Sequence, residues 1–154
     1  MSSIVITGGA GFIGSNLVYR ALADTTDPIV VVDKLTYAGS RLNLEPALRD
    51  RRVTFIQADI ADHVAMASVL AEHQPRAILN LAVETHVDRS VAGPADFVPP
   101  NVVGTFSLLE EARAARDAGV AAPDVLEMVT ATAADVLRLD EAGRIRPGGA
   151  ADFV

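Results

Sequence analysis

A glycine-rich turn near the N-terminus constrains the fold of this chain more than any other feature. Residues 4–7 form an apolar, β-branched run that is typical of a buried strand. Gly8, Gly11 and Gly14 follow at equal spacing, and an amphipathic stretch then extends to about Ala23. The first glycine permits a tight turn, the second lets backbone amides approach an anion, and the third lets the helix pack closely on the strand. The pattern predicts a strand–turn–helix unit of the dinucleotide-binding type, with the diphosphate at the helix N-terminus.

An acidic residue stands where such a unit holds a ribose. Asp33 ends a second apolar run, residues 29–33, and lies 19 residues beyond Gly14 (33 − 14). A carboxylate there accepts hydrogen bonds from both ribose hydroxyls and repels a 2′-phosphate, which favours NAD over NADP. Lys34, the only lysine in the chain, weakens that preference slightly. The alternative interpretation is that the glycines form a purely structural turn.

Strand-like and helix-like segments alternate through the first three-quarters of the chain. After a polar loop over residues 34–52, strands are predicted at residues 53–57 and 77–81. A helix between them is capped by Asp62 and stopped by Pro75. Strands separated by helices imply parallel pairing with right-handed crossovers, so we predict an α/β, doubly wound, Rossmann-like sheet. The predicted helix faces are Met66, Val69 and Leu70 in that helix, and a stripe of Val98, Val102, Phe106, Leu109 and Ala112 in a long helix over residues 96–118.

Composition excludes several classes of function. The 154 residues correspond to about one domain, and half of them are hydrophobic, which argues against general disorder. The net charge of −7, without a long basic cluster, argues against nucleic acid or an anionic membrane as a partner. The lack of cysteine excludes disulfides, thiolate metal sites and thiol catalysis. No metal site, membrane span or signal peptide is apparent, so we expect a soluble, cytoplasmic protein.

Five segments carry a specific family resemblance, in order and with the family's spacing. They are TGGAGFIGSN, VVDKLTYAGSRLNL, QADIAD, NLAVETHVDRSVAGPADFV and NVVGTFSLLEEAR. From about residue 4 to residue 118 the chain closely resembles the dTDP-glucose 4,6-dehydratases, which are extended short-chain dehydrogenases/reductases. The resemblance implies NAD as the cofactor and a nucleotide sugar such as dTDP-glucose as the substrate.

The resemblance also implies which positions meet the two ligands. Phe12 and Ile13 are expected at the diphosphate, and Thr85 and His86 toward the sugar nucleotide, although a lone histidine such as His86 is more often a hydrogen-bonded structural group than a chemical one. The full set implied for the cofactor is Gly8, Gly11, Phe12, Ile13 and Gly14 at the turn, Asp33, Lys34, Leu35, Thr36, Ala38 and Gly39 around the adenosine ribose, Asp59 and Ile60 at the adenine, and Leu81, Ala82, Val83 and Glu84 on the nicotinamide side.

Two positions depart from the family pattern inside the match. Val83 stands where the family usually has an alanine. Pro100-Asn101 replaces the family's Thr-Asn, which removes a hydroxyl contact to the cofactor. Proline is tolerated at the start of a helix, so we expect this change to weaken binding more than folding.

The proton-transfer groups of the family are missing from these residues. Its members use a Tyr-x-x-x-Lys pair, but the position four residues before Lys34 is Val30. Where the dehydratases carry Ser-Thr-Asp-Glu, this chain has residues 130–133, TATA, and Asp140-Glu141 comes too late. We therefore assign no catalytic residue and predict that the chain is catalytically incomplete.

The C-terminal residues follow a different pattern. We predict a partial NAD-binding domain over residues 1–119 and a divergent tail, a helix plus a loop, over residues 120–154. The segment VTATAADVLRLDEAGRIRPGGAADFV resembles the C-terminal segment of amidohydrolases, although a chance match of an alanine-rich helix and a Gly-Pro loop is the alternative. A small hydrolase is disfavoured because the chain has no His-x-His metal motif.

Two functional hypotheses from different classes follow. In the first, the chain is the NAD-binding part of a dTDP-glucose 4,6-dehydratase-like protein of deoxysugar synthesis. In the second, it is a non-catalytic interaction protein that forms a homo- or hetero-oligomer through the 96–118 helix, for example with a full-length dehydratase. The resemblance supports this second hypothesis because family members dimerise through helices in this region.

Overall fold

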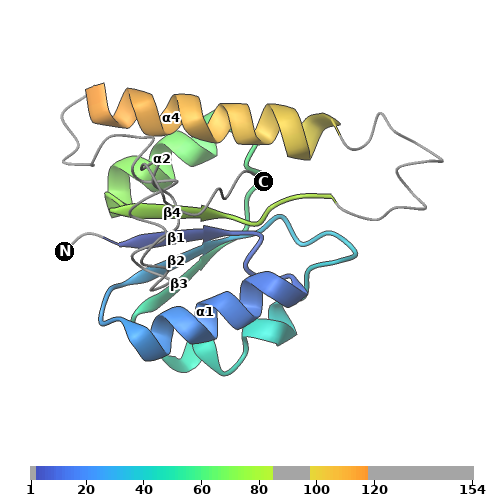
Figure 1. Cartoon of the computed structure of the whole chain (residues 1–154), viewed down its shortest axis with the longest axis vertical. Coiled ribbons are helices and arrows are strands. Elements are labelled where there is room, and N and C mark those ends of the chain that lie inside the picture. The colour runs from blue at the N-terminus through green and yellow to red at the C-terminus, as the bar shows by residue number, and fades with distance from the viewer. Residues whose placement is uncertain (1–2, 85–97, 118–154) are drawn as a thin grey trace, which may run out of the picture.

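Four parallel strands form one sheet in the order β3-β2-β1-β4 (Figure 1). The computed structural model describes residues 3–84 and 98–117. The strands are β1 (Ile4–Thr7), β2 (Ile29–Val32), β3 (Val53–Ile56) and β4 (Ala77–Asn80). Because β1 pairs with both β2 and β4, it lies in the interior of the sheet, and all four of its residues are buried.

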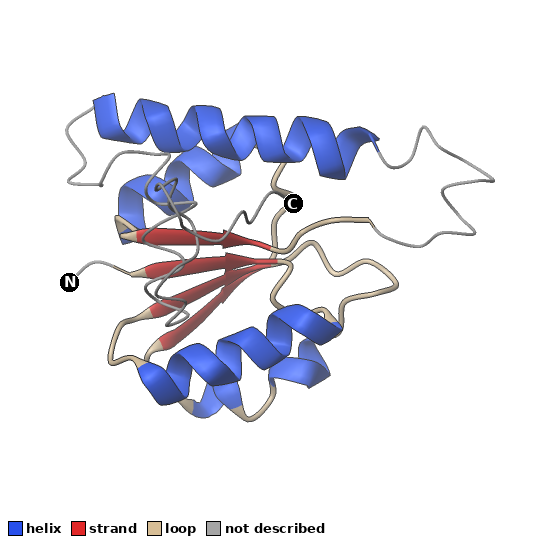
Figure 2. Ribbon diagram, viewed as in Figure 1, coloured by secondary structure: helices blue, strands red, loops and turns tan. Residues whose placement is uncertain are grey.

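Helices cover both faces of the sheet (Figure 2). One face carries α1 (Phe12–Asp24) and two short 3₁₀ helices, η1 (Arg41–Leu44) and η2 (Ala47–Arg49). The other face carries α2 (His63–His73) and α4 (Thr105–Asp117). A π-helical segment, η4 (Pro99–Gly104), leads directly into α4. This arrangement confirms the predicted α/β fold with a doubly wound parallel sheet.

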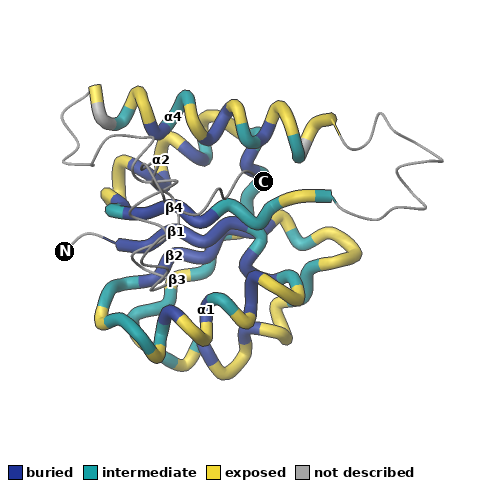
Figure 3. The backbone as a smooth tube through the Cα atoms, viewed as in Figure 1, coloured by how far each residue is buried: buried dark blue, intermediate teal, exposed yellow. Residues whose placement is uncertain are grey.

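Alternate residues of each strand contribute to two separate apolar cores, one on each face of the sheet. Ile4 and Ile6 of β1 pack with Val18 and Ala21 of α1. Val5 packs in the opposite direction, in the core that α2 and α4 share. Figure 3 shows β1, β2 and β4 as a buried layer between half-exposed helices, whereas the edge strand β3 is only partly covered. The β-branched runs of β1 and β2 are therefore typical of strands that are buried on both faces of a sheet.

Most predicted elements are present, with ends that differ by about one residue. Strands β2, β3 and β4 each end one residue earlier than predicted. Asp62 caps α2 as predicted, since its Oδ1 accepts a hydrogen bond from the Ala65 amide at 3.1 Å. The helix ends at His73, and its C-cap residue Gln74 has a left-handed φ of 43° one residue before Pro75. The predicted polar loop contains η1 and η2, which bury Leu44 and Ala47 against the α1 side of the sheet.

The predicted stripe on the long helix is largely exposed. Val98, Val102, Phe106 and Leu109 are 51%, 61%, 59% and 37% exposed, and Ala112 alone of the stripe is buried. The face that meets the sheet and α2 instead carries Gly104, Ser107, Leu108 and Ala112. Small residues are needed there because a Cβ at Gly104 would lie 2.7 Å from the Ile60 side chain.

Several sequence predictions concern residues outside those the structure describes. These are the positions between 85 and 97, the domain boundary near residue 119 and the tail over residues 120–154. Among the described helices, none is both long and apolar enough to cross a membrane. Within the same residues, no group of three or more His, Cys, Asp or Glu side chains is placed to hold a metal ion.

The two neighbouring leucines of α4 provide a test of which helix face is packed. We expect Leu108→Ala to lower the free energy of unfolding by about 2–5 kcal/mol, because Leu108 is 2% exposed. Leu109→Ala serves as the matched control and should cost about 1 kcal/mol or less. Urea unfolding followed by circular dichroism at low protein concentration measures both values. Equal losses would contradict this orientation of α4.

Candidate functional site

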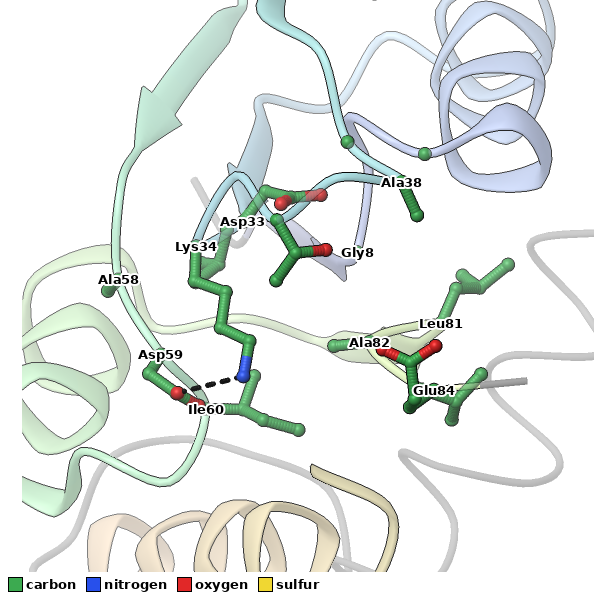
Figure 4. A pocket seen from close by; sticks show the side chains of 15 residues that line it. Gly8, Asp33, Lys34, Ala38, Ala58, Asp59, Ile60, Leu81, Ala82 and Glu84 are labelled. Atoms are coloured by element: carbon green, nitrogen blue, oxygen red, sulfur yellow. Dashed lines mark hydrogen bonds and ion pairs between the residues drawn. The ribbon is translucent and has the colours of Figure 1, made fainter. Parts of the chain in front are cut away.

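A cleft opens at the carboxyl ends of the parallel strands (Figure 4). Ligands bind at this edge in open α/β sheets, because the loops there diverge to opposite faces of the sheet. The structure brings most of the predicted cofactor positions together around this cleft. They are Gly8, Gly11, Asp33, Lys34, Thr36, Ala38, Gly39, Asp59, Ile60, Leu81, Ala82, Val83 and Glu84, joined by Val32 and Ala58.

The floor of the cleft is built from backbone segments packed too closely for side chains. Gly8 has a φ of +65°, and a Cβ there would lie 2.4 Å from the Leu81 carbonyl oxygen. A Cβ at Gly14 would lie 2.2 Å from the Gly8 carbonyl oxygen. Gly14 therefore lies beneath the turn. It contributes to the cleft indirectly, by letting α1 pack against the turn, as the glycine spacing predicts.

The N-terminus of α1 points at this floor with its first amides uncapped by any side chain. Gly11 occupies the N-cap without a side-chain hydrogen bond, and no acidic residue lies in the first turn. The side chains of Phe12 and Ile13 are 82% and 70% exposed and do not line the cleft. What these two residues offer is therefore their backbone amides and the positive end of the helix dipole.

Asp33 is held in one orientation by two backbone amides. It is buried, and its Oδ2 accepts a hydrogen bond from the Ala10 amide at 2.9 Å, while its Oδ1 accepts one from the Leu35 amide at 2.8 Å. Leu35 has a left-handed φ of 59°, and its side chain packs against the core on the α1 side. Leu35 therefore lies outside the cleft lining, although its amide fixes a residue that lines it.

An ion pair joins two of the predicted positions on one side of the cleft (Figure 4). The Lys34 ammonium lies 3.1 Å from Asp59 Oδ2, and Asp59 Oδ1 accepts a hydrogen bond from the Ala61 amide at 3.0 Å. Burial alone would raise the pKa of Asp59. The Ala61 amide and the Lys34 charge outweigh this effect, so the pKa lies below its ordinary value.

A polar network that the sequence analysis missed anchors the end of β4. Asn80 Oδ1 accepts hydrogen bonds from the Thr7 hydroxyl at 2.5 Å and from the Ala82 amide at 3.3 Å. Its Nδ2 donates to the Thr105 hydroxyl at 3.2 Å. One amide side chain thus ties β1, the segment after β4 and the start of α4 together. The signal in the sequence was an asparagine at the end of an otherwise apolar run.

Asn101 and Tyr37 are two further residues of the site that the sequence analysis did not place. Asn101 bonds to the backbone of Glu84, and the Tyr37 hydroxyl donates to the Glu84 carboxylate. In the sequence, Asn101 stands out only as part of the substituted Pro100-Asn101 dipeptide. The predicted substrate positions Thr85 and His86 lie outside the described residues.

The sheet order, glycine turn and buried acidic residue together define a Rossmann-like α/β protein. The sequence model of the family described as GDP-mannose 4,6 dehydratase matches residues 5–133, which is more than half of the chain. The chain belongs to this family.

Individual relatives point to the same family. A dTDP-glucose 4,6-dehydratase from Escherichia coli is 54% identical over 110 residues, which are 71% of this chain and 30% of that relative. A dTDP-glucose 4,6-dehydratase from Streptomyces venezuelae, solved with NAD bound, has a TM-score of 0.69 at 44% identity, covering 76% of this chain and 36% of that one. A UDP-glucose 4-epimerase from Stenotrophomonas maltophila was solved with NAD and formylated UDP-arabinopyranose. It has a TM-score of 0.66 at 31% identity, covering 77% of this chain and 34% of that one. The chain thus spans about a third of the length of these proteins.

The pair formed by Lys34 and Asp59 predicts an acid-dependent contribution to stability. Because folding lowers the pKa of Asp59, this contribution is complete above the ordinary value of about 3.9 and is lost as pH falls through the lowered value. Carboxyl-carbon NMR should therefore give a titration midpoint for Asp59 below about 3.9. Lys34→Gln should raise that midpoint, whereas the control Arg20→Gln should leave it unchanged. An unaltered midpoint in Lys34→Gln would contradict the assigned cause.

Proposed function

We propose that this chain binds NAD in the cleft at the carboxyl edge of its sheet. The observation that carries the proposal is the placement of Asp33, a buried carboxylate fixed by two amides at the end of β2. A carboxylate in that place accepts hydrogen bonds from the adenosine ribose hydroxyls. The NAD bound by the solved Streptomyces venezuelae relative supports the choice of cofactor.

The cleft residues divide into parts that suit each portion of NAD. The uncapped amides of Phe12 and Ile13 and the turn at Gly8 and Gly11 suit the diphosphate. Asp59, Ile60 and residues 81–84 all line the cleft. We propose that the first two border the adenine and the last four border the nicotinamide. When bound, NAD supplies a hydride acceptor, and the chain's own residues bind and orient it.

The substrate of the family chemistry is part of the same proposal. The relatives named above support a nucleotide sugar of the dTDP-glucose class, which Thr85 and His86 would contact. Within these 154 residues no tyrosine stands four positions before the only lysine, Lys34. We therefore propose that these residues bind NAD but do not dehydrate a nucleotide sugar by themselves, since a missing general acid or base costs about 10²–10⁴ in rate.

Titration with the two dinucleotides tests the assignment of Asp33. We expect saturable binding of NAD and weaker binding of NADP, because the Asp33 carboxylate repels a 2′-phosphate. Asp33→Asn should weaken NAD binding about tenfold to a hundredfold, because it removes charge-assisted hydrogen bonds. Asp27→Asn is the control, because Asp27 pairs with Arg76 at 2.6 Å and does not line the cleft. Calorimetry measures all four affinities, and equal affinity of the unmutated chain for NAD and NADP would refute the assignment.

A second candidate function, pairing with another protein chain, is supported by the apolar surface of η4 and α4. Val98, Val102, Val103, Phe106 and Leu109 are all exposed along one continuous helical segment. Exposed apolar patches of this kind mark interaction surfaces. We propose that this surface joins a second copy of the chain or a full-length dehydratase.

Sedimentation velocity over a range of concentrations tests this pairing. We expect the unmutated chain to self-associate, and Phe106→Asp to shift it toward the monomer because a charge in an apolar interface is costly. Leu42→Asp is the control, since Leu42 is also exposed but lies in η1 on the opposite face of the sheet. Mixing with a full-length dehydratase distinguishes a heterologous partner from self-association. A chain that stays monomeric both alone and in the mixture would exclude this role.

A further inference from the structure

A continuous set of hydrogen bonds links three parts of the chain at the mouth of the cleft. The Glu84 amide donates to Asn101 Oδ1 at 2.8 Å, and Asn101 Nδ2 donates to the Glu84 carbonyl oxygen at 2.9 Å. The Tyr37 hydroxyl donates to the Glu84 carboxylate. The link therefore runs from the loop after β2, through the segment after β4, to η4.

Asn101 fixes the backbone of Glu84 by bonding to both its amide and its carbonyl group. Its side-chain amide supplies one acceptor and one donor to the Glu84 amide and carbonyl, as a neighbouring strand would. The preceding amides are also bonded, since Ala82 donates to Asn80 Oδ1 and Val83 donates to the Leu81 carbonyl oxygen at 3.0 Å. With its backbone held in this way, Glu84 has a fixed position from which its carboxylate reaches Tyr37.

The position of this link relative to the sheet gives it a role in the cleft. Glu84 lines the cleft, and Tyr37 lies between Thr36 and Ala38, which also line it. Figure 4 shows Ala38 on one side of the cleft and Leu81 and Glu84 on the other. Because β2 and β4 flank β1 in the sheet, a bond between their following segments crosses the carboxyl end of β1, where the glycine turn lies.

We propose that Tyr37, Glu84 and Asn101 form a strap across the cleft that slows the release of a bound dinucleotide. Asn101 is the positioning residue, because it acts on the cleft only through Glu84. The strap rests on the proposed function, since NAD is the ligand that it retains. Its bonds must open each time NAD enters or leaves, so we expect the strap to slow both steps, and the rate of dissociation reports its effect on release.

Hydrogen exchange in the chain without NAD tests the anchor. In the unmutated protein, the Glu84 amide should exchange slowly because it donates to Asn101. We expect Asn101→Ala to speed exchange at Glu84 at least tenfold. Tyr19→Phe is the matched control, because it removes the hydroxyl of another exposed tyrosine, which donates to the Asn43 carbonyl oxygen at 2.8 Å away from the cleft lining. Unchanged exchange at Glu84 in Asn101→Ala would overturn the positioning role, whatever the affinity for NAD.

Stopped-flow measurement of NAD dissociation tests the strap itself. Tyr37→Phe and Asn101→Ala should each speed dissociation about tenfold, and the double variant should be no faster than the faster single variant, because both act on one link. Tyr19→Phe should dissociate NAD at the unmutated rate. Additive effects would overturn the action of Asn101 through Glu84 and Tyr37.

The remaining outcomes separate the strap from the proposed function. Failure of the unmutated chain to bind NAD would overturn the proposed function, and the retention role with it. Normal NAD binding with unchanged dissociation in both single variants would overturn the strap alone.

Discussion

The close contact between three backbone segments at the carboxyl end of β1 is the constraint on which the rest of the site depends. The Gly8 turn lies against the Leu81 backbone on one side and against Gly14 of α1 on the other, with no room for a Cβ at either glycine. This contact directs the first amides of α1 at the cleft floor and brings the segment after β4 to its edge. The positions of Asp33, Glu84 and the strap are all defined relative to this contact.

Much of the fold could be predicted because local patterns and burial agree. The β-branched runs at residues 4–7 and 29–32 are buried on both faces of the sheet. A continuous apolar segment is therefore enough to predict each of these strands. Asp62 was recognisable as a cap because its partner, Ala65, lies only three residues away. The family resemblance in turn named most of the positions that line the cleft, although the sequence alone could not show that Leu35 turns toward the core.

The rest depended on contacts between residues far apart in the chain. Asn80 bonds to Thr7 and Thr105, and Asn101 bonds to Glu84, so neither asparagine has a local signature of its role. The stripe from Val98 to Leu109 satisfied the helical period, but the period does not say which face meets the sheet. The inward face carries Gly104, which packs closely against Ile60, and the buried Ser107, and such small residues contribute little to a hydrophobicity pattern.

The two amide bonds to Asp33 bear on how cofactor preference evolves in such a chain. The carboxylate that we propose discriminates against a 2′-phosphate also orders the turn, because it holds Ala10 next to the glycines and stabilises the left-handed backbone of Leu35. A neutral small residue at position 33 would remove the electrostatic barrier and the scaffold together. Adaptation to the phosphorylated dinucleotide therefore requires compensating changes in the surrounding loop before, or alongside, the loss of the acidic side chain.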